Sequence, residues 1–476
     1  HLLRYIQMLY HENVYVLKDG FVTPGISPTR GLKQGCPLSP LLFSIYISDL
    51  QQAMPDRKLG ARTLVHEVSI PHIEFADDLA IMSNTAPRLQ SLLNHLDSYA
   101  HAKALDVSTS KTVVMVFGSQ QDQTTFHFRG TAIQRVSEFK YLGLRLSTSF
   151  SLHRVTAQMQ SLFLAGIRKA TSYASKYGTS RVASTHLRLF QQYGLSSGFY
   201  GAQLWSLPWL AADTIAPQER HYNQFMRSLL GVGRKAKMAA VLQECGVAPL
   251  KLYWWRLVIR FWNHLVGHNS TLIKVVLEAD RLHQGSKTWS GKLRKAVVRT
   301  KATSAFGALA MGTKMDKGLV MREIQDEHIR SLGPISLAYR EHRSAFSFYW
   351  ACIQNQPKVG LSNLFELKKP DYFKVELGPL ARSHLARFRL RCFGLRFIKS
   401  AWVGSIGRDC HLCNNGFQDE EHVLFECDFP SVVALRARYQ CLFAGQPLHI
   451  FLRQNPRLLA KFFIELAKAL ESDDHI

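Results

Sequence analysis

The stretch HIEFADDLAIMS at residues 72–83 places two adjacent aspartates, Asp77 and Asp78, between two short apolar runs. This pattern predicts a β-hairpin whose tip carries both carboxylates. Proteins hold Mg²⁺ through one or two carboxylates together with substrate phosphates, so such a tip fits half of a phosphoryl-transfer site. Aspartate is also common in solvated turns that bind nothing. The rest of the chain has to discriminate between these two interpretations.

A loop rich in glycine and proline precedes the hairpin, in the sequence RGLKQGCPLSPLLFSIYISDL at residues 30–50. Pro40 predicts the first turn of an apolar helix over residues 41–50. A helix N-terminus beside basic side chains favours phosphate groups. A loop that only caps a buried helix fits the same pattern.

Charge is distributed unevenly along the 476 residues, a length that suggests roughly two to four domains. Residues 1–150 hold 14 Lys and Arg against 12 Asp and Glu, whereas residues 151–476 hold 45 against 23. Such a basic excess predicts an anionic partner, most often nucleic acid. No apolar run has the length of a membrane span, so we expect no membrane partner.

Three cysteines and a histidine are spaced as Cys410-x2-Cys413-x8-His422-x4-Cys427. Their number and type predict a closed tetrahedral site for structural Zn²⁺. His411 is a less favoured substitute ligand. Basic residues just before the cluster are candidate nucleic-acid contacts: Arg387, Arg389 and Arg391.

From residue 151 onward, apolar residues recur every three to four positions and predict long helices. Trp254, Val258 and Trp262 share one face of such a helix, which favours core packing over base stacking. Candidate phosphate contacts are the basic residues Arg227, Arg234, Lys235, Lys237, Arg256 and Arg260. A solvated helix face is the alternative for these residues. Residues 287–317 are basic and rich in small residues, and we interpret them as a linker or mobile arm.

Four blocks occur in a recognisable order: residues 31–50, the acidic stretch FADDLAIMS, LDVSTSKTVVMVFG at 105–118 and FKYLGLRLS at 139–147. Together they resemble the palm of reverse transcriptases, specifically those of non-LTR (LINE-type) retrotransposons. The Cys-Cys-His-Cys cluster is similar to the module that these proteins carry after a helical thumb. The resemblance implies an α+β fold with a partial palm at 1–150, a thumb-like region at 151–285, a basic linker or helical connector at 286–375 and a zinc module at 376–476.

The resemblance also implies roles for individual residues. Asp77 would bind the catalytic metal, Mg²⁺ or Mn²⁺, with help from Asp78. Gln34 and Gly35 would line the incoming deoxynucleoside triphosphate. Phe75 and Ala76 would lie beneath the primer terminus. Lys111 would assist the departing pyrophosphate, although a surface lysine fits equally well.

The family implies an RNA template, a DNA primer or target, target-primed cDNA synthesis and a nuclear location. Its palm has a further carboxylate-bearing strand, and its fingers, before the helix expected at residues 1–12. We therefore expect this chain to be a C-terminal part with impaired catalysis. The alternative function is a nucleic-acid-binding remnant without polymerase activity. Group II intron maturases and telomerases fit less well, because of the zinc module.

Overall fold

The computed structural model describes residues 1–11, 25, 31–54, 60–62, 68–118, 123–149, 151–283, 288–331, 349, 369–399, 407–443 and 447–471. The chain forms two compact units, His1–Ser137 and Glu138–Ile476. Each unit has its own hydrophobic core. The expected end of the palm at residue 150 differs from this division, because the strands that follow Ser137 pack on the helices after them.

The core of the first unit forms on one face of helix α4 (Ala86–Ala102), where Leu92, Leu96 and Tyr99 are buried. Among the described residues of this unit, short strand pairs and three other helices accompany α4. The helices are α1 (Leu2–Tyr10), α2 (Ser39–Tyr46) and α3 (Leu50–Ala53). The antiparallel pairs are β1 (Ala61–Arg62) with β2 (Ser69–Ile70), β3 (His72–Phe75) with β4 (Asp78–Ile81), and β6 (His127–Phe128) with β7 (Thr131–Ala132); β5 (Val113–Val114) and β8 (Gln134–Arg135) are parallel.

The helix expected over residues 41–50 is shorter than predicted. Helix α2 begins at Ser39, carries Pro40 in its first turn and ends at Tyr46. The chain turns before Asp49, whose carboxylate accepts a hydrogen bond of 2.7 Å from the Tyr99 hydroxyl. This contact fixes the segment after α2 on helix α4.

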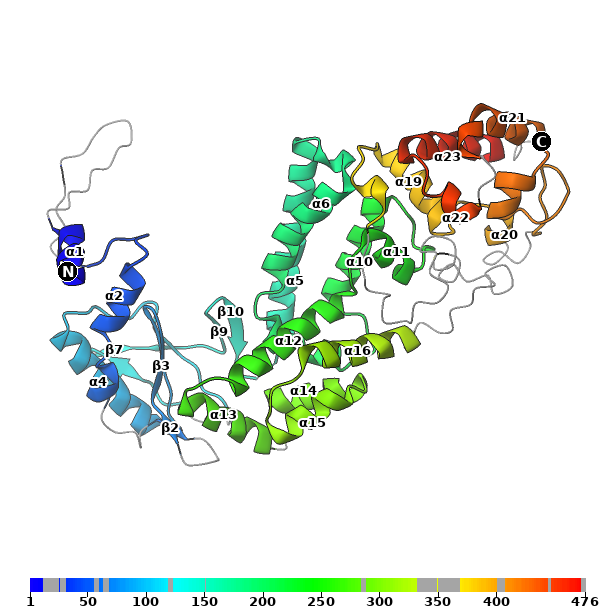
Figure 1. Cartoon of the computed structure of the whole chain (residues 1–476). Helices are drawn as coiled ribbons and strands as arrows, with labels where there is room; N and C mark the ends of the chain where they lie inside the picture. The colour runs from blue at the N-terminus through cyan, green and yellow to red at the C-terminus, as the bar shows by residue number, and fades with distance from the viewer. Residues whose placement is uncertain are drawn as a thin grey trace. The chain divides into compact units, whose positions relative to one another are not determined.

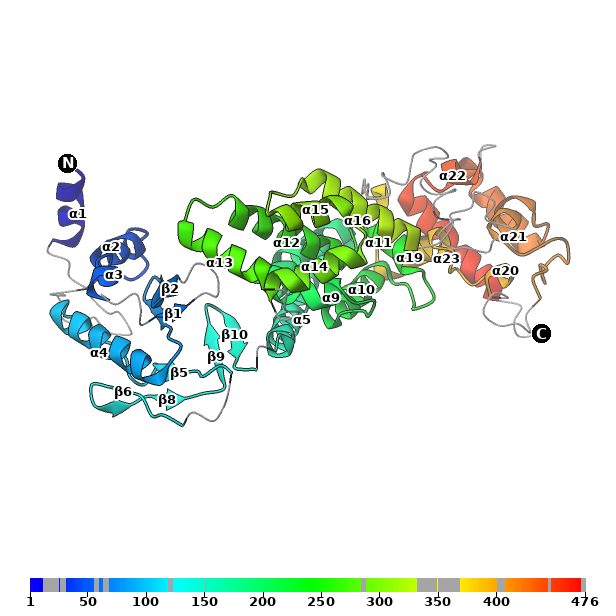
Figure 2. The ribbon, with the colours of Figure 1, turned by 90° about the horizontal axis from the view of Figure 1, so that it is seen from below.

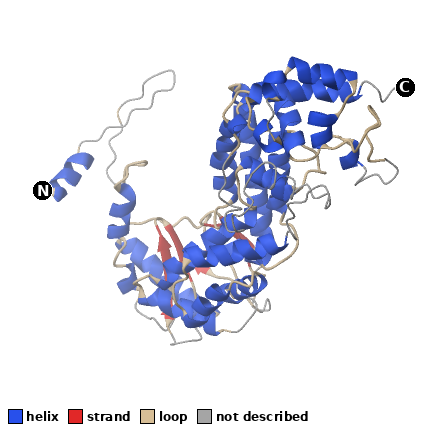
Figure 3. Cartoon of the chain, turned by 45° about the vertical axis from the view of Figure 1, so that its right-hand side comes forward, coloured by secondary structure: helices blue, strands red, loops and turns tan. Residues whose placement is uncertain are grey.

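The second unit opens with the antiparallel strands β9 (Glu138–Tyr141) and β10 (Leu144–Ser147), which pack on helix α5 (His153–Lys176). Gln158 on α5 donates a hydrogen bond of 2.9 Å to the Gly143 carbonyl between the strands. Beyond this pair the named elements of the described residues are all helices, joined by loops (Figure 3). Helices α5 and α6 (Ala183–Phe190) lie side by side (Figure 1).

The other helices that the structure describes in the second unit follow in chain order. They are η1 (Thr179–Arg181), the π-helical turn η2 (Gln191–Leu195), α7 (Ser196–Gly198), α8 (Ala202–Trp205), α9 (Leu207–Leu210), α10 (Pro217–Leu230), α11 (Met238–Cys245), α12 (Leu250–Val266), α13 (Thr271–Leu282), α14 (Trp289–Arg299), α15 (Thr303–Met311) and α16 (Lys317–Ser331). After α16 come η5 (Asp371–Phe373), α19 (Pro379–Arg389), α20 (Arg396–Lys399), η6 (His422–Glu426), α21 (Pro430–Arg438), η7 (Gln440–Leu442), α22 (Leu448–Phe451) and α23 (Pro456–Glu471).

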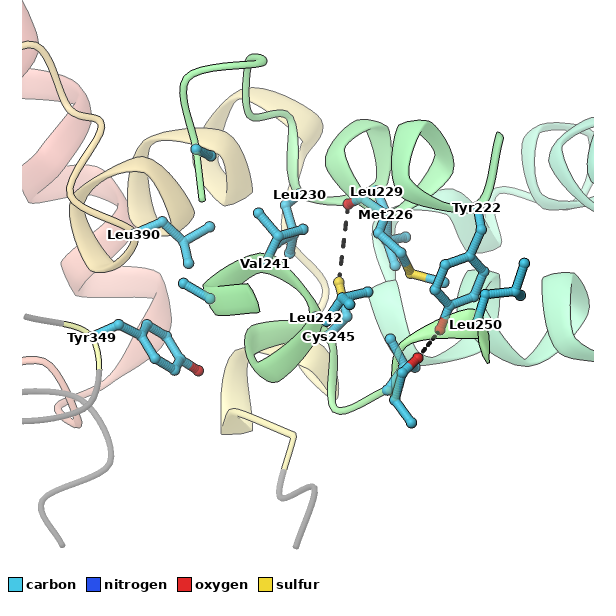
Figure 4. Packing of buried hydrophobic residues seen from close by; sticks show 14 of the residues in the cluster. Tyr222, Met226, Leu229, Leu230, Val241, Leu242, Cys245, Leu250, Tyr349 and Leu390 are labelled. Carbon is cyan, nitrogen blue, oxygen red and sulfur yellow. Dashed lines mark hydrogen bonds between the residues drawn. The ribbon is translucent and has the colours of Figure 1, made fainter. Parts of the chain in front are cut away.

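One hydrophobic core runs through this unit, with buried side chains from Val155 to Leu466. Figure 4 shows a part of it, where Met226 from α10 and Cys245 from α11 meet. The three regions expected at 151–285, 286–375 and 376–476 all contribute to this core, and their boundaries stay predictions.

Residues 287–317 are not a mobile arm where the structure describes them. Helix α14 packs on α15, α15 on α16 and α16 on α12 (Figure 2), with Leu293, Val297 and Leu309 buried. The interpretation was wrong because small apolar residues at helical spacing separate the lysines and arginines and form the buried face. Most of residues 332–368 lie outside the described part. The α+β fold class is confirmed, and no described helix is both long and apolar enough to cross a bilayer.

Candidate polymerase site and metal centre

The acidic hairpin forms as the sequence predicts. Phe75 of β3 pairs with Asp78 of β4, so that Ala76 and Asp77 form a two-residue turn at the tip. Ala76 has a φ of 54°, a left-handed value that two-residue hairpins usually reach with glycine or asparagine. An alanine in this region costs about 1–2 kcal/mol, and such strain is typical of functional sites.

Both carboxylates of the tip are exposed, and so is the Phe75 ring before them. The nearby Glu74 carboxylate pairs with the imidazole of His72, 2.9 Å away. Among the described residues, no third carboxylate or histidine joins Asp77 and Asp78 in a cluster of metal ligands. The tip therefore supplies two carboxylates, a number that suits Mg²⁺ when phosphates and water provide the other ligands.

Gln34 and Gly35 form a tight turn just before helix α2. The Cys36 amide donates to the Lys33 carbonyl at 3.2 Å, and Gly35 has a φ of 81°. The Ser39 hydroxyl also donates to the Lys33 carbonyl, at 2.7 Å. The turn is thus anchored to the helix, while Gln34 is exposed and a Cβ at Gly35 would meet no atom within 4 Å.

Cys36 in this turn is a feature that sequence reasoning passed over. A hydrogen bond from the Leu38 backbone amide lowers the pKa of its thiol. A single cysteine carries no signal in sequence, and the shift depends on the turn that brings Cys36, three residues before the start of α2, to the Leu38 amide.

Lys111 is exposed, in the turn that precedes strand β5. Its backbone amide donates to the Ser108 carbonyl at 3.2 Å. Within the described residues, no hydrogen bond or ion pair joins Lys111 or Gln34 to the acidic tip. The first unit therefore presents these residues on three separate turns.

The four residues of the Cys-Cys-His-Cys pattern come together in the second unit. Their ligand atoms all lie within 4.8 Å of one another. The Sγ atoms of Cys410 and Cys427 are 4.0 Å apart, and Cys413 Sγ is 3.3 Å from His422 Nε2. Ligands around a tetrahedral Zn²⁺ are separated by about 3.6–3.8 Å, so the cluster fits this ion.

Local structure positions these ligands. The Cys410 amide donates to the Gly416 carbonyl at 2.9 Å, which folds the first two cysteines into a tight loop. The His422 amide donates to Asp419 Oδ1 at 3.0 Å at the start of η6. His411 is not among the clustered ligands, and its Nδ1 lies 3.2 Å from Gln418 Nε2.

Burial raises the pKa of the Cys427 thiol to about 12. Burial also raises the pKa of Cys413, and the neighbouring Cys410 thiol adds to this effect. A thiol must lose its proton to become a ligand, so binding of a cation by this cluster releases protons.

Most of the predicted nucleic-acid contacts are on the surface of the second unit. Arg256 and Arg260 are both exposed, one turn apart on α12, while Trp254, Val258 and Trp262 are buried. The core role of these three is thereby confirmed. The basic segment after α10 is exposed at Arg234, Lys235 and Lys237. Arg227 is half-buried, and burial lowers its pKa.

The arginines before the metal cluster divide into two groups. Arg387 is exposed. Arg389 is buried, with its Nε 2.6 Å from Glu244 Oε1, and Arg391 is buried, with its Nε 3.3 Å from Glu420 Oε1. The prediction of nucleic-acid contacts at Arg389 and Arg391 is wrong, because both guanidinium groups are enclosed with carboxylates.

Comparison with known proteins identifies relatives for the first part of the chain. Residues 5–146 match the family model described as reverse transcriptase (RNA-dependent DNA polymerase), and this match includes β9 and β10 of the second unit. The Pol polyprotein of the type-2 retrotransposable element R2DM of Drosophila melanogaster is 29% identical over 156 residues, which are 30% of this chain and 14% of that protein.

Two other similar proteins also come from retrotransposable or mobile elements. A Pol polyprotein of the type-1 retrotransposable element R2 of Popillia japonica is 28% identical over 193 residues, 38% of this chain and 31% of that protein. The RNA-directed DNA polymerase from mobile element jockey of Drosophila funebris is 26% identical over 146 residues, 29% of this chain and 15% of that protein. The chain thus spans less than a third of the length of these relatives. By this match and these relatives, the N-terminal part of the chain belongs to the reverse transcriptase family, in the type carried by non-LTR retrotransposons.

Proposed function

We propose that this chain acts in RNA-directed DNA synthesis of the non-LTR retrotransposon type. The observation that carries the proposal is the hairpin tip, where Asp77 and Asp78 are exposed on a strained two-residue turn within the segment matched to reverse transcriptases. The reaction is an in-line displacement: the 3′-oxygen of a DNA primer attacks the α-phosphorus of a deoxynucleoside triphosphate, and the bond to pyrophosphate breaks.

The roles proposed for the residues follow from their chemistry. Asp77 and Asp78 would hold the divalent ion, Mg²⁺ or Mn²⁺, and the ion would supply charge neutralisation for the attacking oxygen and the departing pyrophosphate. Gln34 hydrogen-bonds the incoming nucleotide, and Gly35 leaves space for it because no Cβ is present.

Two further positions complete this part of the site. Phe75 and Ala76 support the primer terminus from below. Lys111 neutralises the leaving pyrophosphate through its ammonium group.

The second unit is proposed to hold the RNA template and the DNA primer or target through exposed basic residues. Arg256 and Arg260 project from one face of α12, and Arg387 is exposed on α19. The basic segment after α10 adds Arg234, Lys235 and Lys237, and the half-buried Arg227 adjoins it. The Cys-Cys-His-Cys cluster would hold Zn²⁺ in a structural role, since its four ligands close the coordination sphere. Target-primed synthesis on chromosomal DNA would place the protein in the nucleus.

The test is extension of a DNA primer annealed to RNA, by the natural polypeptide that contains these 476 residues. We expect extension that needs Mg²⁺ or Mn²⁺ and that stops at the first template base whose complementary nucleotide is withheld. Extension on a DNA template but not on an RNA template would contradict the proposal.

A second candidate is nucleic-acid binding without synthesis. It is favoured by the excess of 45 Lys and Arg over 23 Asp and Glu in residues 151–476 and by the lack of a third clustered carboxylate beside Asp77 among the described residues. Salt-dependent RNA binding without any extension in the same assay would select this candidate.

A further inference from the structure

Three tyrosines form a stack at the end of helix α5 in the second unit. The rings of Tyr173 and Tyr177 are nearly parallel, with centroids 5.9 Å apart and an interplanar angle of 10°. Tyr193, on the π-helical turn η2, stacks on Tyr173 at 5.5 Å and 8°. Tyr173 and Tyr193 are half-buried, whereas Tyr177 is 63% exposed, so the stack ends at the surface.

The fold holds this stack in place. A Cβ at Gly166 of α5 would lie 2.3 Å from the Tyr193 carbonyl oxygen, so η2 approaches α5 as closely as only glycine permits. The Ser197 hydroxyl donates to the same carbonyl at 2.8 Å. A π-helical turn is rare and frequently marks a functional position. Here it brings Tyr193 against Tyr173.

Two lysines make cation–π contacts with the rings. The ammonium of Lys169 lies over the Tyr193 ring, 4.7 Å from its centroid, and that of Lys176 lies over the Tyr177 ring, 5.5 Å from its centroid. Both lysines are exposed. A ligand that offers a flat ring and a negative charge in alternation would match both features.

The surrounding sequence is unusually free of acidic residues. Residues 139–212 contain eight Lys and Arg and no Asp or Glu. The carboxylate of Glu376, which pairs with Arg181 at 3.3 Å, comes from a different part of the chain. The field around the stack therefore favours a polyanion.

We propose that Tyr177, supported by Tyr173 and Tyr193, is a stacking site for an unpaired base of a single-stranded nucleic acid, with Lys169 and Lys176 contacting the flanking phosphates. Stacking on aromatic rings in a basic surface is the way in which proteins hold single strands without reading their sequence. A duplex does not fit, because its bases are already stacked on one another. The inference rests on the proposed function in one respect: RNA-directed DNA synthesis supplies the single strand, either template or displaced target strand, that would bind here.

The test is the affinity of the natural polypeptide for fluorescein-labelled 12-nucleotide oligo(U), for oligo(dT) of the same length, and for a 12-base-pair duplex. Stacking is worth about 1–3 kcal/mol per base, so Tyr177→Ala should weaken single-strand binding roughly 5- to 150-fold and leave duplex binding unchanged. Tyr177→Phe should bind like wild type. The oligo(U) and oligo(dT) arms identify whether RNA, DNA or both strands use the site.

Phe306→Ala is the matched control, since Phe306 is a 46%-exposed aromatic residue on α15 in the same unit. Wild-type single-strand affinity in Tyr177→Ala would overturn the proposal, and so would an equal loss for single strands and duplex. If Tyr177→Ala melts at the wild-type temperature, a folding defect is excluded. If it melts at a lower temperature, Tyr177→Phe, which keeps the aromatic ring, is compared with wild type instead. Primer extension is measured separately, because its absence in wild type refutes polymerase function while the binding comparison still judges the stacking site.

Discussion

Arg389 is the residue whose replacement should destabilise the second unit most clearly. It lies at the end of α19, with its side chain 8% exposed, beside Glu244 of α11, which is fully buried. The Glu244 carboxylate accepts four hydrogen bonds: 2.6 Å and 3.2 Å from Arg389 Nε and Nη2, 2.7 Å from the Tyr349 hydroxyl and 2.8 Å from the Tyr372 hydroxyl. Arg389 Nη1 also donates to the Leu452 carbonyl at 3.1 Å.

Arg389→Met keeps most of the side-chain volume but leaves the Glu244 carboxylate buried without a cation. Removing one partner of a buried ion pair costs about 3–5 kcal/mol in the free energy of unfolding. For a unit of this size, that loss should lower the melting temperature by roughly 4–7 °C. Differential scanning calorimetry and urea titration of the natural polypeptide measure both quantities.

Two variants separate this explanation from a general effect of arginine removal. Arg387→Met removes an exposed arginine two residues away and should change stability by less than about 0.5 kcal/mol. Glu244→Leu combined with Arg389→Met should be more stable than Arg389→Met alone, because no uncompensated charge is then buried. A melting temperature of Arg389→Met equal to that of wild type would refute the reasoning.

Three other predictions concern the metal cluster, the basic surface and pH. A strong chelator, or Cys427→Ser, should lower the melting temperature of the second unit, because metal binding stabilises the fold and Cys427 is buried in the core. Cys441→Ser, which replaces an exposed cysteine, should leave the melting temperature unchanged. Arg256→Gln with Arg260→Gln should reduce RNA affinity and lower the slope of log affinity against log salt by about 2; an unchanged slope would exclude phosphate contacts. Burial lowers the pKa of His186 to about 4, so the imidazole takes up a proton at higher pH in the unfolded chain than in the folded one, and stability should fall as pH decreases from about 6.5 to 4. His186→Gln should make this fall in melting temperature smaller. A fall identical to that of wild type would contradict the assignment.

The acidic hairpin and the metal cluster could be predicted from sequence because each is encoded locally. Alternating apolar residues around Asp77 specify the strands and the turn, and the spacing of Cys410, Cys413, His422 and Cys427 brings four ligands within reach of one another. Neither feature depends on contacts between distant parts of the chain.

The wrong prediction at Arg389 and the tyrosine stack that the sequence did not predict both involve contacts between residues that are apart in sequence. Arg389 looks like a surface residue until α11 brings Glu244, 145 positions earlier, against it. The stack of Tyr173 and Tyr193 depends on a π-helical turn and on close approach at Gly166, and neither has a periodicity that can be read from sequence. Tertiary packing determined both outcomes.

RNA-templated primer extension by Asp77→Asn in the natural polypeptide is the most direct test of the central claim, that this carboxylate serves in nucleotide transfer. Asp106→Asn is the matched control, because Asp106 is a 93%-exposed carboxylate of the same unit that pairs with Arg129. We predict that Asp77→Asn lowers the rate of Mg²⁺-dependent extension by about 10²-fold or more, while Asp106→Asn stays within about threefold of wild type. Extension by Asp77→Asn at the wild-type rate would contradict the account.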